Sequence, residues 1–264
     1  MENSTFIPGE GSAVGGPGAQ TESRLLGAIL NESENIVFFG GAGVSTESGI
    51  PDFRSAKGLY NDTRYNIPPE TLLSRTYFDR NTEKFYDFYR ANILHLGAEP
   101  NPAHLKLAEL ERAGRLRAVI TQNIDGLHQK AGSKNVIELH GSVYRNYCGR
   151  CHKSYEVRYI ASSSGIPYCD CGGVIKPDVV LYEEGLNRDD MSRAINYISE
   201  ADVLIIGGTS LVVYPAAGLV TYYRGDKLII INKSETDNDS RARLIIRDGI
   251  GAVMGGLTVI DRKG

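Results

Sequence analysis

Short apolar runs that end in glycine or polar turns recur along the chain, and this pattern constrains the fold more than any other feature. Each run has the length of a buried strand. Uninterrupted apolar strands are typical of parallel sheets whose two faces are covered by helices, and ligands bind beyond the carboxyl ends of such strands. We therefore predict an α/β fold with a ligand spread along one sheet edge. The runs cover residues 36–39, 117–121, 203–206, 228–231 and, more weakly, 243–246.

Other segments fill in this outline. Residues 136–139 and 179–181 predict two further short strands, and periodic apolar positions predict helices at 22–31, 104–113 and 189–200. Aromatic and aliphatic positions between residues 57 and 96 indicate short helices with one apolar face, and no strand. Residues 1–20 are rich in glycine and proline, so we expect a disordered N-terminal arm there.

The turn after the first run has the composition of a phosphate-binding loop. It contains Gly41, Ala42 and Gly43, and Ser45 with Thr46 supplies the expected start of a helix. Glycine lets a ligand approach the backbone, and free amides at a helix N-terminus face an anion. Alone, the turn leaves a nucleotide site and a packing role equally open. Thr46 stands where the dinucleotide pattern has a third glycine, and no ribose-binding acid follows.

Three polar segments near predicted strand ends indicate a function beyond nucleotide binding. The first segment continues from the glycine turn and carries an acid, an aromatic ring and a guanidinium. The second segment has several polar side chains close together after residue 121. The third is His140, which lies beside a glycine after a short apolar run and is a candidate general base. The first two segments contain Asp52, Phe53, Arg54, Gln122, Asn123, Ile124 and Asp125.

The four cysteines form two close pairs. Cys148 and Cys151 are followed, after seventeen residues, by Cys169 and Cys171. This arrangement is typical of a structural zinc ion held by four thiolates, although the second pair is one residue tighter than the common spacing. Because all four positions are filled, such an ion stabilises a small module and performs no chemistry.

Composition excludes several classes of partner. Hydrophobic residues make up 41% of the chain and charged residues 23%, and the net charge is -3, so nothing attracts it to nucleic acid or to an anionic membrane. We find no apolar run near the ~20 residues of a membrane span and no secretory signal. We therefore expect a cytoplasmic protein without nucleic-acid or membrane partners. The sequence leaves its oligomeric state open.

Taken together, six motifs resemble the sirtuin family of NAD-dependent protein deacylases, in order and in spacing. They are residues 41–45 with 49–54, 121–125, 140–141, the four cysteines, 208–210 and 231–232. The resemblance implies a Rossmann-like NAD-binding domain from residues 21–54, 101–144 and 177–264. It also implies a smaller domain made of a helical module, residues 55–100, and a zinc module, residues 145–176.

The resemblance implies roles for individual residues around NAD. The glycine turn would hold the pyrophosphate, the segment after residue 121 would orient nicotinamide and its ribose, and Phe53 would cover the reactive sugar face. Asp52 and Arg54, on either side of Phe53, would also contact NAD. The NAD-binding residues would be Gly41, Ala42, Gly43, Thr46, Asp52, Phe53, Arg54, Gln122, Asn123, Ile124, Asp125, Gly208, Thr209, Ser210 and Asn232, with Lys233 and Ile250 as weaker candidates.

The chemistry implied is acyl transfer that consumes NAD. The acyl oxygen attacks the anomeric carbon of the ribose as nicotinamide departs. His140 then acts as general base through the ribose hydroxyls, with Asn123 as the second catalytic residue. Water ends the sequence and leaves free lysine and O-acetyl-ADP-ribose. Protein mono-ADP-ribosyl transfer from the same cleft is the alternative. A non-catalytic nucleotide sensor or a dehydrogenase fits the residues less well.

The acyl-lysine substrate is expected beside Val180, whose backbone can pair with a peptide as an added strand. Tyr182, Val212 and Val213 would flank it. The family commonly has glycine where this chain has Glu183, and the pair Glu183-Glu184 predicts either an attraction for basic substrate residues or a solvated turn. Relatives that take acidic acyl groups carry Tyr-x-x-Arg in the helical insertion. This chain has Tyr86 and Tyr89 there, so uncharged acyl groups, acetyl first, are expected.

Overall fold

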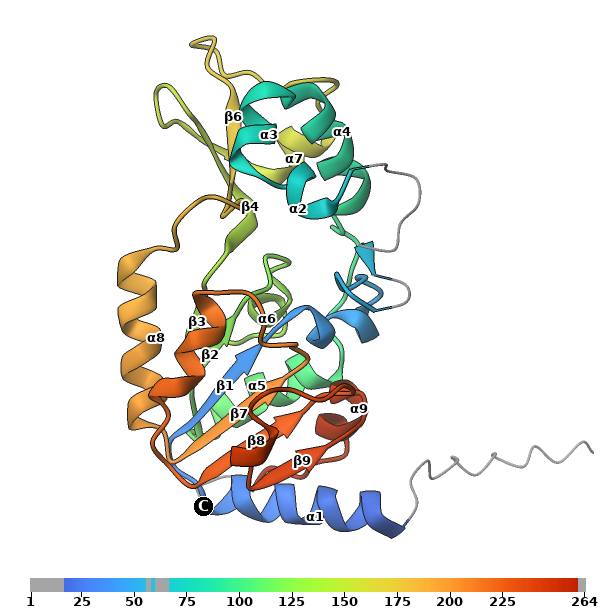
Figure 1. The fold of residues 1–264 in the computed structure, drawn as a ribbon, viewed down its shortest axis with the longest axis vertical. Coiled ribbons are helices and arrows are strands. Elements are labelled where there is room, and N and C mark those ends of the chain that lie inside the picture. Colours follow the sequence, from blue (N-terminus) through green and yellow to red (C-terminus); the bar gives the residue numbers. More distant parts are fainter. Residues whose placement is uncertain (1–16, 56–57, 60–66, 261–264) are drawn as a thin grey trace, which may run out of the picture.

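The computed structural model describes residues 17–55, 58–59 and 67–260, and it has a larger body below a smaller one (Figure 1). A six-stranded parallel sheet forms the centre of the larger body, in the order β3-β2-β1-β7-β8-β9. Its strands are β1 (Ile36–Gly40), β2 (Leu116–Thr121), β3 (Val136–Glu138), β7 (Val203–Gly207), β8 (Lys227–Ile231) and β9 (Leu244–Ile246). This confirms the predicted α/β fold with a Rossmann-like parallel sheet.

The strand order reverses at β1, and this reversal determines where a ligand can bind. The chain proceeds outward from β1 through β2 to β3, and later strands leave the other side of β1 through β7 and β8 to β9. Loops from the two halves separate at this point, so a crevice forms beyond the carboxyl ends of β1 and β7.

Helices cover both faces of the sheet because successive side chains of β1 point to opposite sides. Phe38 belongs to a core with α1 (Pro17–Glu32), α5 (Pro102–Arg112) and α9 (Ile250–Gly255). Phe39 belongs to a second core with α8 (Arg188–Glu200) and the 3₁₀ segment Ala216–Tyr222. The predicted helices at 22–31, 104–113 and 189–200 correspond to α1, α5 and α8. None of the described helices is long and apolar enough to span a bilayer.

The smaller body joins a three-stranded antiparallel sheet to a group of helices. The sheet has the order β5-β4-β6, from β4 (Gly141–Cys148), β5 (Ser154–Glu156) and β6 (Ile175–Val179). The helices are α2 (Pro69–Leu72), α3 (Arg75–Arg80), α4 (Thr82–Asn92) and α7 (Val157–Ser162). A third core of aromatic and aliphatic side chains joins α4 to β4 and β6. The predicted division into two domains, with boundaries after residues 54, 100, 144 and 176, stays a proposal.

Three local predictions are wrong. Residues 179–181 do not form a strand of the parallel sheet, because β6 ends at Val179 and pairs with β4. Ser45 and Thr46 start no α-helix; two 3₁₀ turns, Ala42–Val44 and Thr46–Ser48, end at Gly49, whose φ is 82°. Residues 17–20, predicted to belong to a disordered arm, open α1. The rest of that arm lies outside the described residues.

Candidate active site

A cavity of about 610 Å³ lies beyond the carboxyl ends of β1, β2, β7 and β8, where residues of both bodies line it. Apart from Val212, which is exposed, every residue that the sequence predicts for NAD, catalysis or the acyl-lysine lines this one cavity. They are Gly41, Ala42, Gly43, Thr46, Asp52, Phe53, Arg54, Gln122, Asn123, Ile124, Asp125, His140, Val180, Tyr182, Gly208, Thr209, Ser210, Val213, Asn232, Lys233 and Ile250.

The glycine turn after β1 and a second glycine turn after β7 are hydrogen-bonded to one another at this cavity. The Gly43 amide donates to the Gly208 carbonyl over 2.8 Å, and the Gly41 amide donates to the Gly207 carbonyl over 3.2 Å. A Cβ atom on Gly43 would lie 2.8 Å from Gly208 Cα, and Gly208 has a φ of 56°. Glycine is therefore required here so that the backbones can approach one another.

This pairing changes which amides remain for an anion. The amides of Gly41 and Gly43 are donated within the protein, and Thr46 Oγ1 donates its proton to the Gly43 carbonyl over 2.9 Å. Ala42 and Thr46 each begin a 3₁₀ turn, and the first amides of a turn have no partner inside it. Of the four residues predicted to hold pyrophosphate, Ala42 and Thr46 therefore have the better placed amides.

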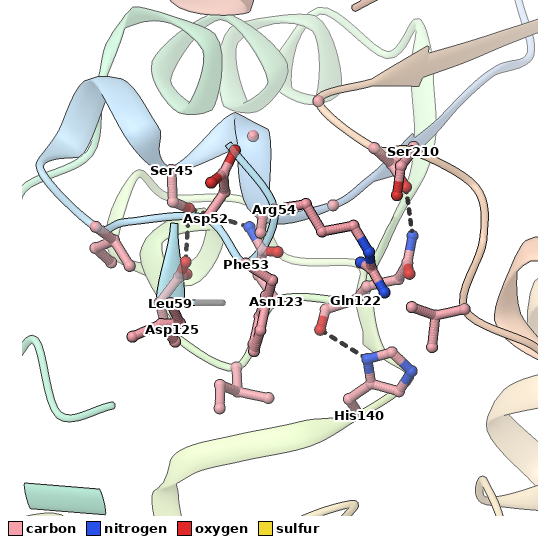
Figure 2. A pocket seen from close by; sticks show the side chains of 18 of the residues that line it. Ser45, Asp52, Phe53, Arg54, Leu59, Gln122, Asn123, Asp125, His140 and Ser210 are labelled. Atoms are coloured by element: carbon pink, nitrogen blue, oxygen red, sulfur yellow. Dashed lines mark hydrogen bonds between the residues drawn. The ribbon is translucent and has the colours of Figure 1, made fainter. Parts of the chain in front are cut away.

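A hydrogen-bonded triad connects the glycine turn to the segment after β2 (Figure 2). Ser45 Oγ donates to Asp125 Oδ2 over 2.6 Å and accepts from Asn123 Nδ2 over 3.0 Å. The Leu127 amide donates to the other oxygen of Asp125 over 2.9 Å. These bonds fix the Asp125 carboxylate and the Asn123 amide at the wall of the cavity.

Sequence reasoning missed the role of Ser45, which it took only as part of a helix start. A signal was available, because Ser45 follows β1 and Asn123 with Asp125 follows the neighbouring strand β2. Polar residues beyond adjacent parallel strands meet at one edge.

His140 lies in the turn between β3 and β4, and its hydrogen bond determines its tautomer. Its Nδ1 lies 3.0 Å from the Gln122 carbonyl oxygen, which can only accept, so Nδ1 carries the proton and Nε2 keeps a free lone pair. Burial lowers the pKa of His140 below its usual 6.5, although the bond to Gln122 acts in the opposite direction. The ring is therefore neutral at pH 7 and able to accept a proton.

The next residue explains how His140 comes so close to the substrate loop. Gly141 has a φ of 77°, and a Cβ atom there would lie 1.9 Å from the Asp178 carbonyl oxygen. With glycine, the chain passes close enough for the Val180 amide to donate to the His140 carbonyl over 3.0 Å. A backbone hydrogen bond thus joins the candidate base to the loop that is predicted to hold the acyl-lysine.

The other end of the cavity is lined by loops after β7 and β8. Gln122 Nε2 donates to Thr209 Oγ1 over 3.0 Å, so the side-chain carbonyl of Gln122 remains as an acceptor. Asn232 Nδ2 donates to the Ser234 carbonyl over 2.8 Å, which orients that side chain within its loop. Ile250 is buried at the start of α9.

The acidic pair Glu183-Glu184 lies in a loop where Glu183 is exposed, as in the predicted solvated turn, and the predicted attraction for basic substrate residues stays a prediction. Glu183 has a φ of 75°, and its carboxylate accepts from the Thr76 amide over 2.9 Å and from the Thr76 hydroxyl over 2.7 Å. These bonds lower the pKa of Glu183. The Glu184 carboxylate accepts from the Leu181 amide over 2.8 Å and from Lys176 Nζ over 3.1 Å. Both carboxylates therefore fix the loop to its surroundings.

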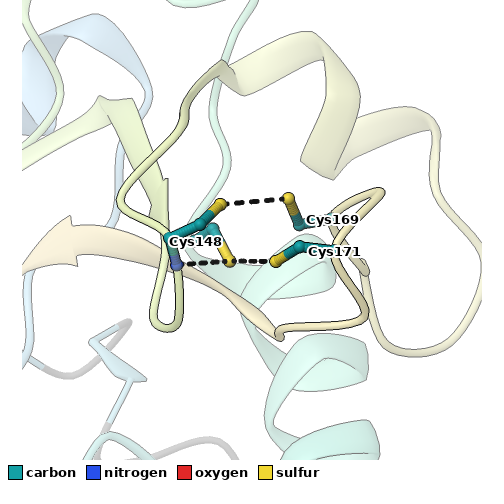
Figure 3. Close-up of side chains that lie close together, drawn as sticks. Cys148, Cys169 and Cys171 are labelled. Atoms are coloured by element: carbon teal, nitrogen blue, oxygen red, sulfur yellow. Dashed lines mark hydrogen bonds between the residues drawn. The ribbon is translucent and has the colours of Figure 1, made fainter.

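The four cysteine sulfurs meet at one end of the smaller body (Figure 3). All four lie within 4.8 Å of one another, and the pairs Cys148–Cys171 and Cys151–Cys169 are each 3.5 Å apart. A tetrahedral zinc ion with Zn–S bonds of about 2.3 Å requires sulfur–sulfur distances of about 3.8 Å. The set therefore fits a structural zinc ion, with no ligand position left for chemistry.

Two buried histidines lie next to each other in the larger body. The rings of His104 on α5 and His128 on α6 (Leu127–Lys130) have centroids 4.7 Å apart. Burial lowers the pKa of His104 to about 4, with Asp125 opposing the shift, and lowers that of His128 well below 6.5. The Asn101 amide donates to His104 Nδ1 over 3.3 Å as part of a helix cap.

These histidines predict a loss of stability in acid. Between pH 6.5 and about 4 the unfolded chain binds a proton at His104 and the folded chain does not. The free energy of unfolding therefore decreases as the pH is lowered through this range. His104 alone contributes a loss on the order of 3 kcal/mol. Urea unfolding at pH 7.5, 6.5, 5.5 and 4.5 measures it. The loss should shrink in His104→Asn, and an unchanged pH dependence in that variant would contradict the assignment.

Comparison with known proteins agrees over most of the chain. The Sir2 family matches residues 41–215. An NAD-dependent protein deacetylase of Clostridium perfringens (strain 13 / Type A) is 60% identical over 240 residues, covering 89% of this chain and 97% of the relative. A solved Sir2 structure with a deacetylated p53 peptide and 3′-O-acetyl-ADP-ribose has a TM-score of 0.81 at 42% identity, covering 88% of this chain and 96% of that one. Another, of Sir2 with a p53 peptide and NAD⁺, has a TM-score of 0.77 at 44% identity, covering 88% and 94%.

Proposed function

Because the chain belongs to the Sir2 family, we propose that it is an NAD-dependent protein deacetylase acting on acetyl-lysine in proteins or peptides. The observation that carries this proposal is the free Nε2 of His140 in a cavity that also contains the two glycine turns and the Ser45 triad. A nucleotide sensor has no use for a neutral base at that position.

NAD would lie along the carboxyl edge of the sheet. The turn amides at Ala42 and Thr46, together with Arg54, would hold its pyrophosphate. Asp52 Oδ1 accepts from the Ser55 amide over 3.0 Å, so Asp52 would shape the loop that carries Phe53 and Arg54. The adenosine half would contact Gly208, Thr209, Ser210, Asn232, Lys233 and Ile250.

The nicotinamide half would lie between the Ser45 triad and His140. Asp125 and Asn123 would bind the carboxamide, with Ile124 excluding water beside them. The free carbonyl of the Gln122 side chain would accept from a ribose hydroxyl. The acyl-lysine would enter beside Val180, with Tyr182 and Val213 on either side.

The reaction transfers the acetyl group to the sugar. The acetyl oxygen forms a bond to the anomeric carbon while the bond from that carbon to nicotinamide breaks, which gives an imidate that joins the lysine to the sugar. His140 Nε2 then takes the proton of a ribose hydroxyl, so the 2′-oxygen attacks the carbon of the imidate. Addition of water releases lysine. The products are nicotinamide, free lysine and O-acetyl-ADP-ribose.

The direct test combines the protein with an acetyl-lysine peptide and NAD. We expect nicotinamide, deacetylated peptide and O-acetyl-ADP-ribose in equal amounts, and no deacetylated peptide when NAD is left out. Mass spectrometry measures all three products. Absence of deacetylated peptide in the complete mixture would contradict the proposal. Labelled ADP-ribose retained on a protein would instead identify the mono-ADP-ribosyltransferase alternative.

We also propose a cytoplasmic location. The four cysteines are placed as metal ligands, and thiols persist in reducing compartments. Fractionation of cells that express the chain, followed by detection of the protein in the cytosolic fraction, tests this.

A further inference from the structure

A buried lysine lies next to the loop that is proposed to hold the substrate. Lys176 is the second residue of β6 and is 6% exposed, and among the described residues it is the only buried lysine. A buried ammonium group is unfavourable unless it is paired and hydrogen-bonded, so its presence requires an explanation. The proposed reaction does not use this amine, which lies outside the described lining of the active-site cavity.

The ammonium group of Lys176 has three partners, one for each of its protons. Its Nζ donates to the Pro177 carbonyl over 3.3 Å and to the Val179 carbonyl over 3.0 Å. The third partner is Glu184 Oε2, over 3.1 Å. The lysine therefore joins the end of β6 to a residue that comes five positions after that strand.

The Glu184 carboxylate connects the lysine to the rest of the loop. The oxygen that accepts from Lys176 also accepts from the Leu181 amide over 2.8 Å. The Glu184 amide donates to the Leu181 carbonyl over 3.0 Å, so these two residues close a turn. The other carboxylate oxygen accepts from Arg75 Nη1 over 3.2 Å, on a more exposed side. Residues 179–184 thus fold around a buried ion pair.

The loop that this ion pair holds faces the active-site cavity. All six residues from 179 to 184 line the cavity, and the Val180 amide donates to the His140 carbonyl over 3.0 Å. Replacing a buried ion pair by apolar residues is often neutral for stability, so stability alone does not account for this one. An ion pair can instead specify one conformation of the chain around it.

We propose that Lys176 and Glu184 are positioning residues for the protein substrate, because their ion pair holds residues 179–184 in the shape that receives the acyl-lysine peptide. This inference rests on the proposed deacylase function. Without the ion pair the loop samples other conformations, and the apparent affinity for peptide falls with the population of the competent one. The glycine turns proposed to hold NAD are hydrogen-bonded to one another in the larger body, so the affinity for NAD is unchanged.

The test measures the KM for both substrates in two variants. Lys176→Met keeps an unbranched stem and removes three donors, and Glu184→Gln keeps the shape of the carboxylate and removes its charge. Each should raise the KM for acetyl peptide about tenfold or more, as expected when hydrogen bonds to a charged group are lost, and leave the KM for NAD unchanged. At saturating peptide kcat should persist, because bound peptide selects the competent loop. Fluorescence anisotropy of a labelled acetyl peptide measures the same loss of affinity without turnover.

Arg75→Gln is the matched control. It removes the more exposed partner of the same carboxylate, and exposed ion pairs contribute little, so both KM values should stay at their wild-type level. The double variant Lys176→Met/Glu184→Gln should weaken peptide binding by less than the product of the single effects, since both changes remove one ion pair. Urea unfolding identifies which variants are folded, and Glu184→Gln keeps the test open if Lys176→Met does not fold.

Three results would each overturn the inference: an unchanged peptide KM in a folded variant, an equal rise of both KM values, or single effects that multiply in the double variant. An equal rise is what a merely structural role predicts. Wild-type turnover of the acetyl peptide tests the proposed function separately, since the inference can fail while that turnover persists.

Discussion

We expect His140→Ala to lose deacetylase activity by a factor of about 10²–10⁴, the range usual for removal of a general base. The reason lies in the geometry of the ring. Nδ1 is committed to the Gln122 carbonyl at 3.0 Å, so Nε2 is the ring nitrogen that can take a proton. His140→Tyr, which has no comparable base at neutral pH, should be equally inactive. Circular dichroism should show both variants folded.

The two chemical stages of the reaction separate the role of His140 from general damage. Cleavage of nicotinamide requires no base, so exchange of labelled nicotinamide into NAD, in the presence of acetyl peptide, should persist in His140→Ala. Formation of O-acetyl-ADP-ribose should not. A folded variant that forms O-acetyl-ADP-ribose at the wild-type rate would refute the assigned role.

The pH dependence provides an independent check. Burial lowers the pKa of His140 below 6.5, so the base is mostly unprotonated at pH 7 and above. We expect kcat/KM to be level above pH 7.5, with its acid limb centred below pH 6.5 and a drop of about tenfold per pH unit below the pKa. An acid limb centred above pH 7 would mean that another group controls the rate.

The parallel sheet could be predicted because its signal is local. Each apolar run is buried on both faces, and its length and composition are visible without knowing its neighbours. The site followed from the same logic, since groups beyond adjacent carboxyl ends must meet. This is why residues as distant as Thr46, Asp125 and Asn232 line one cavity.

What could not be predicted depends on partners far away in the sequence. Residues 179–181 read like any other buried run, but pairing of β6 with β4 places their start in the antiparallel sheet. Gly43 lies in a turn that has the composition of a phosphate-binding loop, yet its amide donates to the Gly208 carbonyl. Glu183 adopts a left-handed conformation that Thr76 stabilises by two hydrogen bonds. In each case a long-range contact overrides the local pattern.

The second large effect concerns the four cysteines. We propose that they bind one zinc ion per chain, and we expect Cys171→Ser or a strong chelator to melt the smaller body. A structural zinc site contributes about 10–16 kcal/mol in peptides, whereas a whole domain is typically stable by only about 5–15 kcal/mol. The thermal unfolding midpoint should therefore fall by well over ten degrees.

Loss of the metal should also reach the active site, because the same strands connect the two. Cys148 ends β4, and β6 begins at Ile175, close after the second cysteine pair, and leads to Val180. If β4 and β6 separate, the Val180 amide no longer reaches His140, so peptide turnover should fall together with zinc content. Asp170→Asn is the matched control. Its carboxylate is 83% exposed and pairs with Lys153 at the surface, so this variant should keep both zinc and activity. Metal analysis that finds well below one zinc per chain in folded, active protein would contradict the assignment.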